Sequence, residues 1–219
     1  MTITAVGFDL DETLAVPSRD RATILADAAE RADAPPLSRE AYLEAHARNL
    51  TGETRTPIFA DLLDGHDADT DPSAVANAYR RGIADALVPL ADVEPFLARL
   101  REEYRVGLLT NGPRLAQRDK LDILGWTDAF DAALVTGELD AGKPDAHAFE
   151  ALLDALGREA SETAYVGDDV EADIAGAADA GLLPIQVLYD GGPEPSPRAA
   201  AHVQRDDLVR RLPEILAEY

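Results

Sequence analysis

The stretch VGFDLDETLAV, residues 6–16, decides the fold and raises an electrostatic question. Its apolar beginning follows a β-branched segment and predicts a buried strand of a parallel sheet. Three acids, Asp9, Asp11 and Glu12, stand within four residues directly after that strand. Like charges repel one another, and the repulsion grows as water is removed. Acids in this position therefore indicate that a cation lies nearby.

The rest of the chain shows two kinds of pattern. Residues 18–87 contain segments with helical spacing, with Asp, Ser or Thr near several starts and Pro or Gly at the breaks. Strand-like and helical segments alternate after residue 87. Such alternation predicts a right-handed, mostly parallel sheet with helices on both faces. We therefore expect an α/β fold: a Rossmann-like, doubly wound core of residues 1–14 plus 88–219, with an all-helical cap of residues 15–87 inserted after the first strand.

Composition limits what the protein can be. With 219 residues, 46% of them hydrophobic, the chain can bury a substantial core. It has no cysteine, which excludes disulfides, zinc–thiolate sites and thiol nucleophiles. The N-terminal sequence lacks the basic region of a signal peptide, and no apolar run approaches the ~20 residues that cross a bilayer. We expect a soluble, cytoplasmic protein that is a monomer or a homodimer.

The net charge of −22 bears on both partners and source. A surface this acidic repels phosphate backbones and anionic lipids, so we expect no nucleic-acid and no membrane partner. The chain has 18 arginines but only two lysines, Lys120 and Lys143. Abundant acids with scarce lysine resemble the composition of halophilic proteins, whose self-repulsion is screened by salt. An acid-rich, GC-biased source is the alternative explanation.

Polar side chains follow the predicted strands where each strand ends. The carboxyl ends of parallel strands meet at one edge of a sheet, where ligands bind. The residues placed there are Asp9, Asp11 and Thr13 after the first strand, Thr110 and Asn111 after the second, Lys143 beyond the third, and Asp168, Asp169 and Asp173 after the fourth. An isolated Asp in so acidic a chain can be a surface charge or a helix N-cap, and for Asp169 and Asp173 that explanation is as good as a role in the site. The informative feature is the ordered set.

This ordered set resembles the haloacid dehalogenase-like hydrolase superfamily. The family motif D-x-D-x-T matches DLDET at residues 9–13, and its strand-end Thr or Ser matches Thr110 in LLTNG. Its lysine ahead of a helix matches Lys143 in GKPD, and G-D-x-x-x-x-D matches GDDVEAD with Asp168 and Asp173. The resemblance covers essentially the whole chain, and the helical insertion resembles the family's cap of the first type.

The resemblance implies a chemical role for the three acids that carry it. Asp9 is implied to be the nucleophile that attacks phosphorus and forms an aspartyl-phosphate. Mg²⁺ is the implied cofactor, held by the carboxylates of Asp9 and Asp168 and by the backbone carbonyl of Asp11. The Asp11 side chain is implied to protonate the leaving alcohol and then to deprotonate the hydrolytic water.

The remaining residues of the set are implied to bind the substrate or to support the residues of the site. Thr110 and Lys143 are expected to hold phosphoryl oxygens, with Asn111 as a further substrate-binding residue. Asp173 is expected to orient Lys143 or a metal-bound water, and Thr13 to support the loop after the first strand. Glu12 and Asp169 receive no role.

Asp11 also separates activities within the family. Dehalogenating relatives need no acid to protonate a halide and usually lack this second Asp. We therefore predict a Mg²⁺-dependent phosphatase that hydrolyses a small phosphomonoester. The alternatives are a phosphomutase of the same fold, a 2-haloacid dehalogenase, a phospho-receiver-like signalling module and a non-catalytic binding protein. Receivers lack both the D-x-D-x-T spacing and the helical insertion.

The substrate stays open, because selectivity lies in the cap. Sugar phosphates, phosphoglycolate and nucleoside monophosphates are all compatible with the motifs. His46 in the cap is a candidate substrate contact. Five arginines are candidates to meet a second anionic group on the substrate: Arg19, Arg21, Arg48, Arg55 and Arg80.

Overall fold

The computed structural model describes residues 2–64, 66 and 69–219, and a six-stranded sheet lies at its centre. Neighbouring strands run parallel in the order β5-β4-β1-β6-β7-β8. The strands are β1 (Ala5–Phe8), β4 (Arg105–Thr110), β5 (Ala132–Val135), β6 (Thr163–Gly167), β7 (Leu183–Leu188) and β8 (Ala201–Gln204). Because β1 pairs with both β4 and β6, its carboxyl end opens at the middle of the sheet. The predicted Rossmann-like parallel sheet is confirmed.

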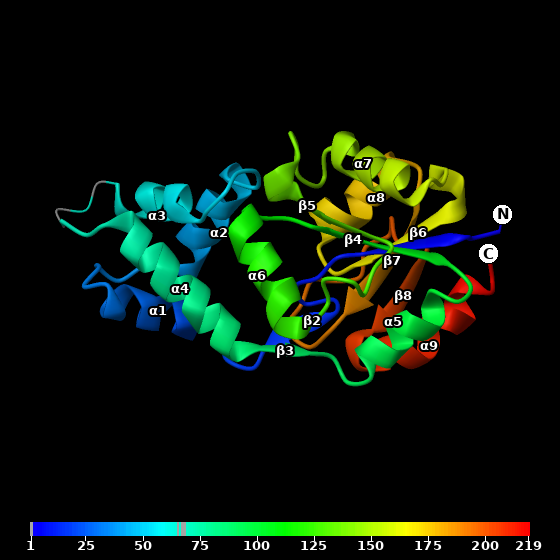
Figure 1. Cartoon of the computed structure of the whole chain (residues 1–219), viewed down its shortest axis with the longest axis horizontal. Helices are drawn as coiled ribbons and strands as arrows, with labels where there is room; N and C mark the ends of the chain where they lie inside the picture. Colours follow the sequence, from blue (N-terminus) through cyan, green and yellow to red (C-terminus); the bar gives the residue numbers. More distant parts are fainter. Residues whose placement is uncertain (1, 65, 67–68) are drawn as a thin grey trace.

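Helices cover both faces of this sheet (Figure 1). On one face, Phe8 of β1 packs edge-on against Phe96, in a cluster that α5 and α9 complete. On the other face, Ala5 belongs to the cluster formed with α7 and α8. The helices of the core are α5 (Val93–Leu100), α6 (Arg114–Leu124), α7 (Ala146–Leu156), α8 (Gly176–Asp179) and α9 (Leu208–Leu216), with the short turns η1 (Thr136–Glu138), η2 (Ala160–Glu162), η3 (Val170–Ala175, a π-helix) and η4 (Arg205–Asp207). Burial on both faces explains why β1 is apolar throughout.

Four further helices pack together at one end of the molecule (Figure 1). They are α1 (Arg21–Arg31), α2 (Arg39–Arg48), α3 (Thr56–Leu63) and α4 (Pro72–Ala86), and they share an apolar cluster of their own. Asp20, Ser38 and Asp71 accept hydrogen bonds from the first turns of α1, α2 and α4, as their positions in the sequence predict. None of the described helices has the length and apolar character needed to cross a membrane.

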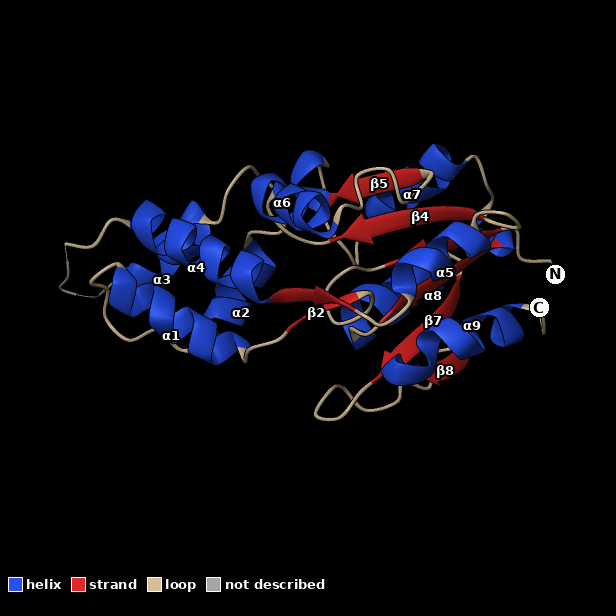
Figure 2. Cartoon of the chain, turned by 60° about the horizontal axis from the view of Figure 1, so that its bottom comes forward, coloured by secondary structure: helices blue, strands red, loops and turns tan. Residues whose placement is uncertain are grey.

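A two-stranded antiparallel ribbon joins these four helices to the core (Figure 2). It consists of β2 (Ala15–Pro17) and β3 (Leu87–Pro89). The sequence predicts an all-helical insertion over residues 15–87 and misses this pair, because three-residue strands are too short to show a period and their partners lie far apart in the chain. The division into a core of residues 1–14 plus 88–219 and a cap of residues 15–87 stays a prediction; β2 begins at the first boundary, and β3 crosses the second.

Candidate active site

The carboxyl ends of the central strands open into a cavity of about 1120 Å³. The strand ends supply one wall, and residues of α1, α2 and α4 supply the other. The cavity is lined by most of the predicted site residues: Asp9, Asp11, Thr110, Asn111, Lys143, Asp168 and Asp173. Thr13 is fully buried behind them. The fold therefore brings the predicted set together at one place.

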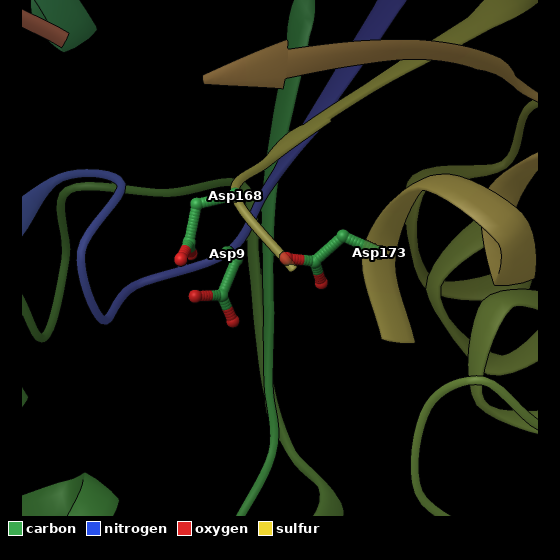
Figure 3. Close-up of side chains that lie close together, drawn as sticks. All are labelled: Asp9, Asp168 and Asp173. Carbon is green, nitrogen blue, oxygen red and sulfur yellow. The ribbon is translucent and has the colours of Figure 1, made fainter. Parts of the chain in front are cut away.

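Three carboxylates that line the cavity lie close together (Figure 3). Asp9 follows β1, Asp168 follows β6, and Asp173 lies in η3; one oxygen of each is within 4.8 Å of the others. Burial is the main cause that raises the pKa of Asp9 to about 7, against the opposing effect of Lys143. Burial and the charges of Asp173 and Asp9 raise the pKa of Asp168 to about 9. Ionising this cluster costs free energy that a cation would offset.

Lys143 is fixed within this carboxylate cluster. Its Nζ donates to Asp9 Oδ1 at 2.7 Å, to Asp173 Oδ1 at 2.6 Å and to the hydroxyl of Tyr165 at 2.9 Å. These three bonds use all the protons of the ammonium group, and only 2% of the side chain is exposed. Burial opposes its charge, but Asp173 and Asp9 raise the pKa of Lys143 well above its ordinary value. The lysine is therefore charged and held in one orientation.

Asn111 fixes the main chain of the same lysine. Its Nδ2 donates to the carbonyl of Lys143 at 2.9 Å, and its Oδ1 accepts from the Lys143 N–H at 2.9 Å. Both ends of the amide are thus engaged with the backbone of a neighbouring loop. Substrate binding by Asn111 stays a prediction, whereas its contacts in the structure position Lys143.

Asp173 is held from two sides. Its Oδ1 accepts from Lys143, and its Oδ2 accepts from the backbone N–H of Asp169 at 3.0 Å. Gly167 lies directly against it, because a Cβ atom built on Gly167 falls 2.4 Å from the carboxylate carbon of Asp173. The glycine of the GDDVEAD motif is therefore required for the close approach of this carboxylate.

Asp11 lies in a different environment from Asp9, although only one residue separates them. Its Oδ1 accepts from Arg21 Nη2 at 2.8 Å, and its Oδ2 accepts from Lys120 Nζ at 2.5 Å and Gln117 Nε2 at 3.1 Å. Burial opposes its ionisation, but Lys120 and Arg21 hold the pKa of Asp11 well below its usual value. The pKa of Asp9 is thus raised and that of Asp11 is lowered, so Asp11 is the stronger acid of the two.

Lys120 and Gln117, both on α6, are site residues that the sequence did not reveal. Gln117 Nε2 donates to Thr110 Oγ1 at 2.5 Å and to the carbonyl of Asn111 at 3.0 Å, in addition to Asp11. Lys120 is 2% exposed, and burial lowers its pKa to about 8 against the opposing charge of Asp11. One signal was available: the chain has two lysines, and both lie in this site.

Glu12 connects the loop after β1 to both walls of the cavity. It adopts a left-handed backbone conformation with φ of 62°. Its carboxylate accepts from Arg21 Nε at 3.2 Å and from Arg205 Nη1 at 2.9 Å, and Arg205 lies over the ring of Tyr189. Arg21 therefore contacts both Asp11 and Glu12 from the side of the four-helix unit.

The five candidate arginines differ in their surroundings. Three form ion pairs away from the carboxylate cluster: Arg19 with Asp27, Arg48 with Asp61 and Arg80 with Asp119. Arg21 pairs with the loop acids. Arg55 lines the cavity, is 7% exposed and has no carboxylate within 4.0 Å in the described part of the chain. His46 also lines the cavity, and burial lowers its pKa to about 3, so it is neutral.

These features define a class of protein: an α/β enzyme with a carboxylate as the candidate nucleophile, a buried lysine beside it and a second carboxylate in a cationic environment. The sequence model of the haloacid dehalogenase-like hydrolases matches residues 3–181. The chain belongs to this family, and the resemblance inferred from its motifs is confirmed.

Two curated relatives are phosphatases. Ribulose-1,5-bisphosphate 5-phosphatase of Halopiger xanaduensis is 32% identical over an alignment of 234 residues, which covers 97% of each chain. N-acylneuraminate-9-phosphatase of Rattus norvegicus is 42% identical over 125 residues, covering 57% of this chain and 50% of the relative. The chain thus matches about half the length of the second relative. Both support the assignment of this hydrolase as a phosphoric monoester hydrolase.

Solved structures agree with the fold. A haloacid dehalogenase-type phosphatase from Thermococcus onnurineus superposes with a TM-score of 0.69 at 24% identity, covering 98% of each chain. A 2-haloacid dehalogenase from Pseudomonas syringae pv. Tomato gives a TM-score of 0.68 at 26% identity, covering 99% of each chain. Since both activities occur on this fold, the reaction must be argued from the side chains of the site.

Proposed function

We propose that this protein is a Mg²⁺-dependent phosphatase that hydrolyses a small phosphomonoester through an aspartyl-phosphate intermediate. The observation that carries the proposal is the contrast between two carboxylates of one loop. Asp9 faces the carboxylate cluster and Lys143, whereas Asp11 faces Lys120, Gln117 and Arg21. A phosphatase of this type needs both a nucleophile and a separate group that exchanges protons.

The donor set around Asp9 fits a magnesium ion, which prefers oxygen ligands. Within the described residues, Asp9 Oδ2 has no hydrogen-bond partner, and Asp168 accepts only two long bonds of 3.3 Å, from Thr13 and Tyr189. Both carboxylates thus have capacity for a cation, with the backbone carbonyl of Asp11 as a third ligand. Asp173 has both oxygens engaged and is better suited to hold Lys143. When bound, the ion supplies the charge that offsets repulsion between Asp9 and the substrate phosphate.

Asp9 and Asp11 divide the chemistry into two displacements. In the first, a carboxylate oxygen of Asp9 bonds to phosphorus and the bond from phosphorus to the ester oxygen breaks. Asp11 gives the leaving alcohol a proton that it must take up beforehand, against the pKa-lowering effect of Lys120 and Arg21. In the second, Asp11 takes a proton from water, the water oxygen bonds to phosphorus, and the bond between Asp9 and phosphorus breaks. Inorganic phosphate leaves, and both carboxyls return to their starting states.

Lys143 and Thr110 serve the same phosphoryl group. Lys143 opposes the rise in the pKa of Asp9 and directs its carboxylate, because it donates to that carboxylate from a fixed position. It also places positive charge where negative charge spreads over the phosphoryl oxygens. Thr110, at the end of β4, presents a hydroxyl to the same space, held by Gln117. Preorganised donors of this kind stabilise the transition state without moving during the reaction.

The alternatives predict different products. A phosphomutase returns the phosphoryl group to the sugar and yields an isomerised sugar phosphate. A 2-haloacid dehalogenase releases halide and has no need of a protonating group at the position of Asp11. A phospho-receiver retains its phosphoryl group for minutes without turning over added esters. The presence of a second carboxyl group at Asp11 favours the phosphatase over the dehalogenase.

A panel of phosphomonoesters with Mg²⁺ in molar KCl tests the proposal. It includes sugar phosphates, phosphoglycolate and nucleoside monophosphates, and the readout is release of inorganic phosphate. We expect turnover of at least one ester, and Asp9→Asn should lower kcat by at least about 10³-fold because the nucleophile is lost. The exposed Asp154→Asn on α7 is the matched control. Activity that survives Asp9→Asn undiminished would defeat the mechanism, whichever ester was hydrolysed.

A further inference from the structure

The structure assigns Arg55 as the recognition site for a second anionic group of the substrate, a carboxylate or a phosphate other than the one that is cleaved. Arg55 precedes α3 and lines the same cavity as Asp9 and Lys143. The inference rests on the proposed function, because it takes the ligand of this cavity to be a phosphate ester. It names the class of ester: one that carries two anionic groups.

Arg55 is exceptional among the arginines of this chain. The chain has 42 acids and 20 bases, so carboxylates are plentiful. In the part of the chain that the structure describes, twelve of the 18 arginines have a carboxylate oxygen within 4.0 Å. The other six in the described part are Arg31, Arg39, Arg55, Arg81, Arg99 and Arg158. Arg55 alone among these six is buried, with 7% exposure. A buried guanidinium without a counter-charge is costly, which indicates that a ligand supplies the anion.

Aromatic side chains lie beside the guanidinium of Arg55. Its guanidinium lies over the ring of Tyr79, 5.5 Å from the centroid, and its Nε is buried without a hydrogen-bond partner in the described residues. Burial raises the pKa of Tyr42 to about 12 and lowers that of His46 to about 3, and Arg55 influences both groups, so both are neutral near it. Lys120, the nearby cation, is already paired with Asp11. In the described part of the chain, Arg55 thus has no carboxylate within 4.0 Å to pair with its charge.

Arg39 extends the same feature along the wall of the cavity. It lies over the ring of Tyr42, 5.0 Å from the centroid, and its Nη1 is also buried without a partner in the described part. Two guanidinium groups, each stacked on a tyrosine, thus face one cavity with unused donors. A planar guanidinium binds carboxylate or phosphate through paired N–H groups, and partial removal from water strengthens such bonds.

Binding to a catalytically silent protein tests this assignment independently of turnover. In the Asp9→Asn background, we compare matched ligands by calorimetry in molar KCl with Mg²⁺: sorbitol 6-phosphate against 6-phosphogluconate, which differ by one carboxylate, and fructose 6-phosphate against fructose 1,6-bisphosphate, which differ by one phosphate. We expect the doubly anionic member of at least one pair to bind about 10- to 100-fold more tightly, as charge-assisted hydrogen bonds allow. The pair that shows the preference identifies the anion as a carboxylate or a phosphate.

Arg55→Met added to that background should remove the preference and leave the Kd of the singly anionic ligand within about threefold. Arg81→Met, at an exposed position of α4 with no ion pair in the described part, is the matched control and should retain the preference. If Arg55→Met does not fold, Arg55→Lys serves instead; it keeps the charge but loses the paired donors, and should reduce the preference by about tenfold. Equal binding of both members of each pair, or a preference that persists without Arg55, would overturn the assignment.

The outcomes separate this inference from the proposed function. A preference that depends on Arg55 supports the inference even if the phosphomonoester panel shows no turnover. Turnover in that panel without any preference for a second anion leaves the phosphatase in place and rejects the role of Arg55. The two proposals therefore stand or fall on different measurements.

Discussion

The two walls of the cavity are built on opposite principles. On the core wall, each ammonium proton of Lys143 has an acceptor, and both carboxylate oxygens of Asp173 accept hydrogen bonds. On the wall formed by the four helices, Arg39 and Arg55 have buried N–H groups without partners in the described residues. The cation of the first wall is thus fixed in place before a ligand binds, whereas the cations of the second wall have N–H groups left for one.

This difference corresponds to two tasks of an enzyme. Groups that stabilise a transition state act best when they are fixed in advance, because they then need no reorganisation during the reaction. Groups that select a substrate gain most when a wrong ligand leaves them buried and unpaired. The core wall therefore suits the reaction that is common to many esters, and the opposite wall suits the choice among them.

The largest change in catalytic rate is expected from Lys143→Met, which alters the core wall only. It removes the charge that holds Asp9 and Asp173 together, so we expect kcat to fall by about 10²- to 10³-fold. Selectivity between singly and doubly anionic esters should not change, because Arg55 is untouched. Steady-state kinetics on such a pair of esters measures both quantities. A loss of selectivity as large as the loss of rate would show that the two walls do not act separately.

The next largest effect is expected from Lys120→Met on α6, which removes a donor from Asp11. If Lys120 positions Asp11 for proton exchange, the effect depends on the leaving group. We expect kcat for an alkyl phosphate to fall by about 10- to 100-fold, and for p-nitrophenyl phosphate, whose leaving group needs no proton, by less than about fivefold. Ile123→Met, half-exposed on the same helix, is the control. Equal losses for both esters would indicate a structural effect only.

A smaller effect is expected from Gly167→Ala. The added methyl would fall 2.4 Å from the carboxylate carbon of Asp173, so either the strand end or the carboxylate must move. We expect the free energy of unfolding to decrease by about 1–3 kcal/mol, as for other overpacked sites. Urea denaturation measures this change, and a magnesium titration followed by intrinsic fluorescence measures the effect on the cluster. An unchanged unfolding curve would show that the Asp173 carboxylate can move away without a loss of stability.

The smallest effect is expected from the exposed surface charges, each of which changes the stability of the fold only slightly and lies outside both walls of the cavity. Acids outnumber bases by 42 to 20, so repulsion outweighs attraction between exposed charges. We propose that the chain is halophilic, and we expect its thermal unfolding midpoint to rise as KCl increases from roughly 0.1 M to 2 M, because salt screens the excess repulsion. Differential scanning calorimetry at the two concentrations measures the shift. Full stability in dilute buffer would contradict the halophilic source.

The core wall could be predicted from the sequence because it follows a rule of topology. Asp9, Thr110 and Asp168 directly follow apolar strands, and parallel strands bring their carboxyl ends to one edge. The order of the strands was not needed for that inference. The sheet as a whole was predictable for the same reason: its strands are long enough, and apolar enough, to be recognised locally.

The opposite wall could not be predicted in this way. Arg55 resembled the paired Arg19, Arg48 and Arg80 in the sequence, because pairing depends on tertiary neighbours and not on local pattern. Gln117 and the ribbon of β2 and β3 were missed for a related reason. Their partners lie far away in the chain. Neither the place of a residue on a helix nor a three-residue strand predicts a contact with a distant segment.

The burial of both lysines has a practical consequence for handling the protein. Lys120 and Lys143 are each 2% exposed, and the chain has no other lysine. Its remaining basic side chains are arginines and histidines. An amine-directed reagent therefore finds no accessible lysine in the folded molecule. Acylation of either lysine should occur only when the cavity opens or the chain unfolds, and a bound ester should slow it. The rate of lysine labelling thus measures how often the cavity opens, and no engineered probe is needed.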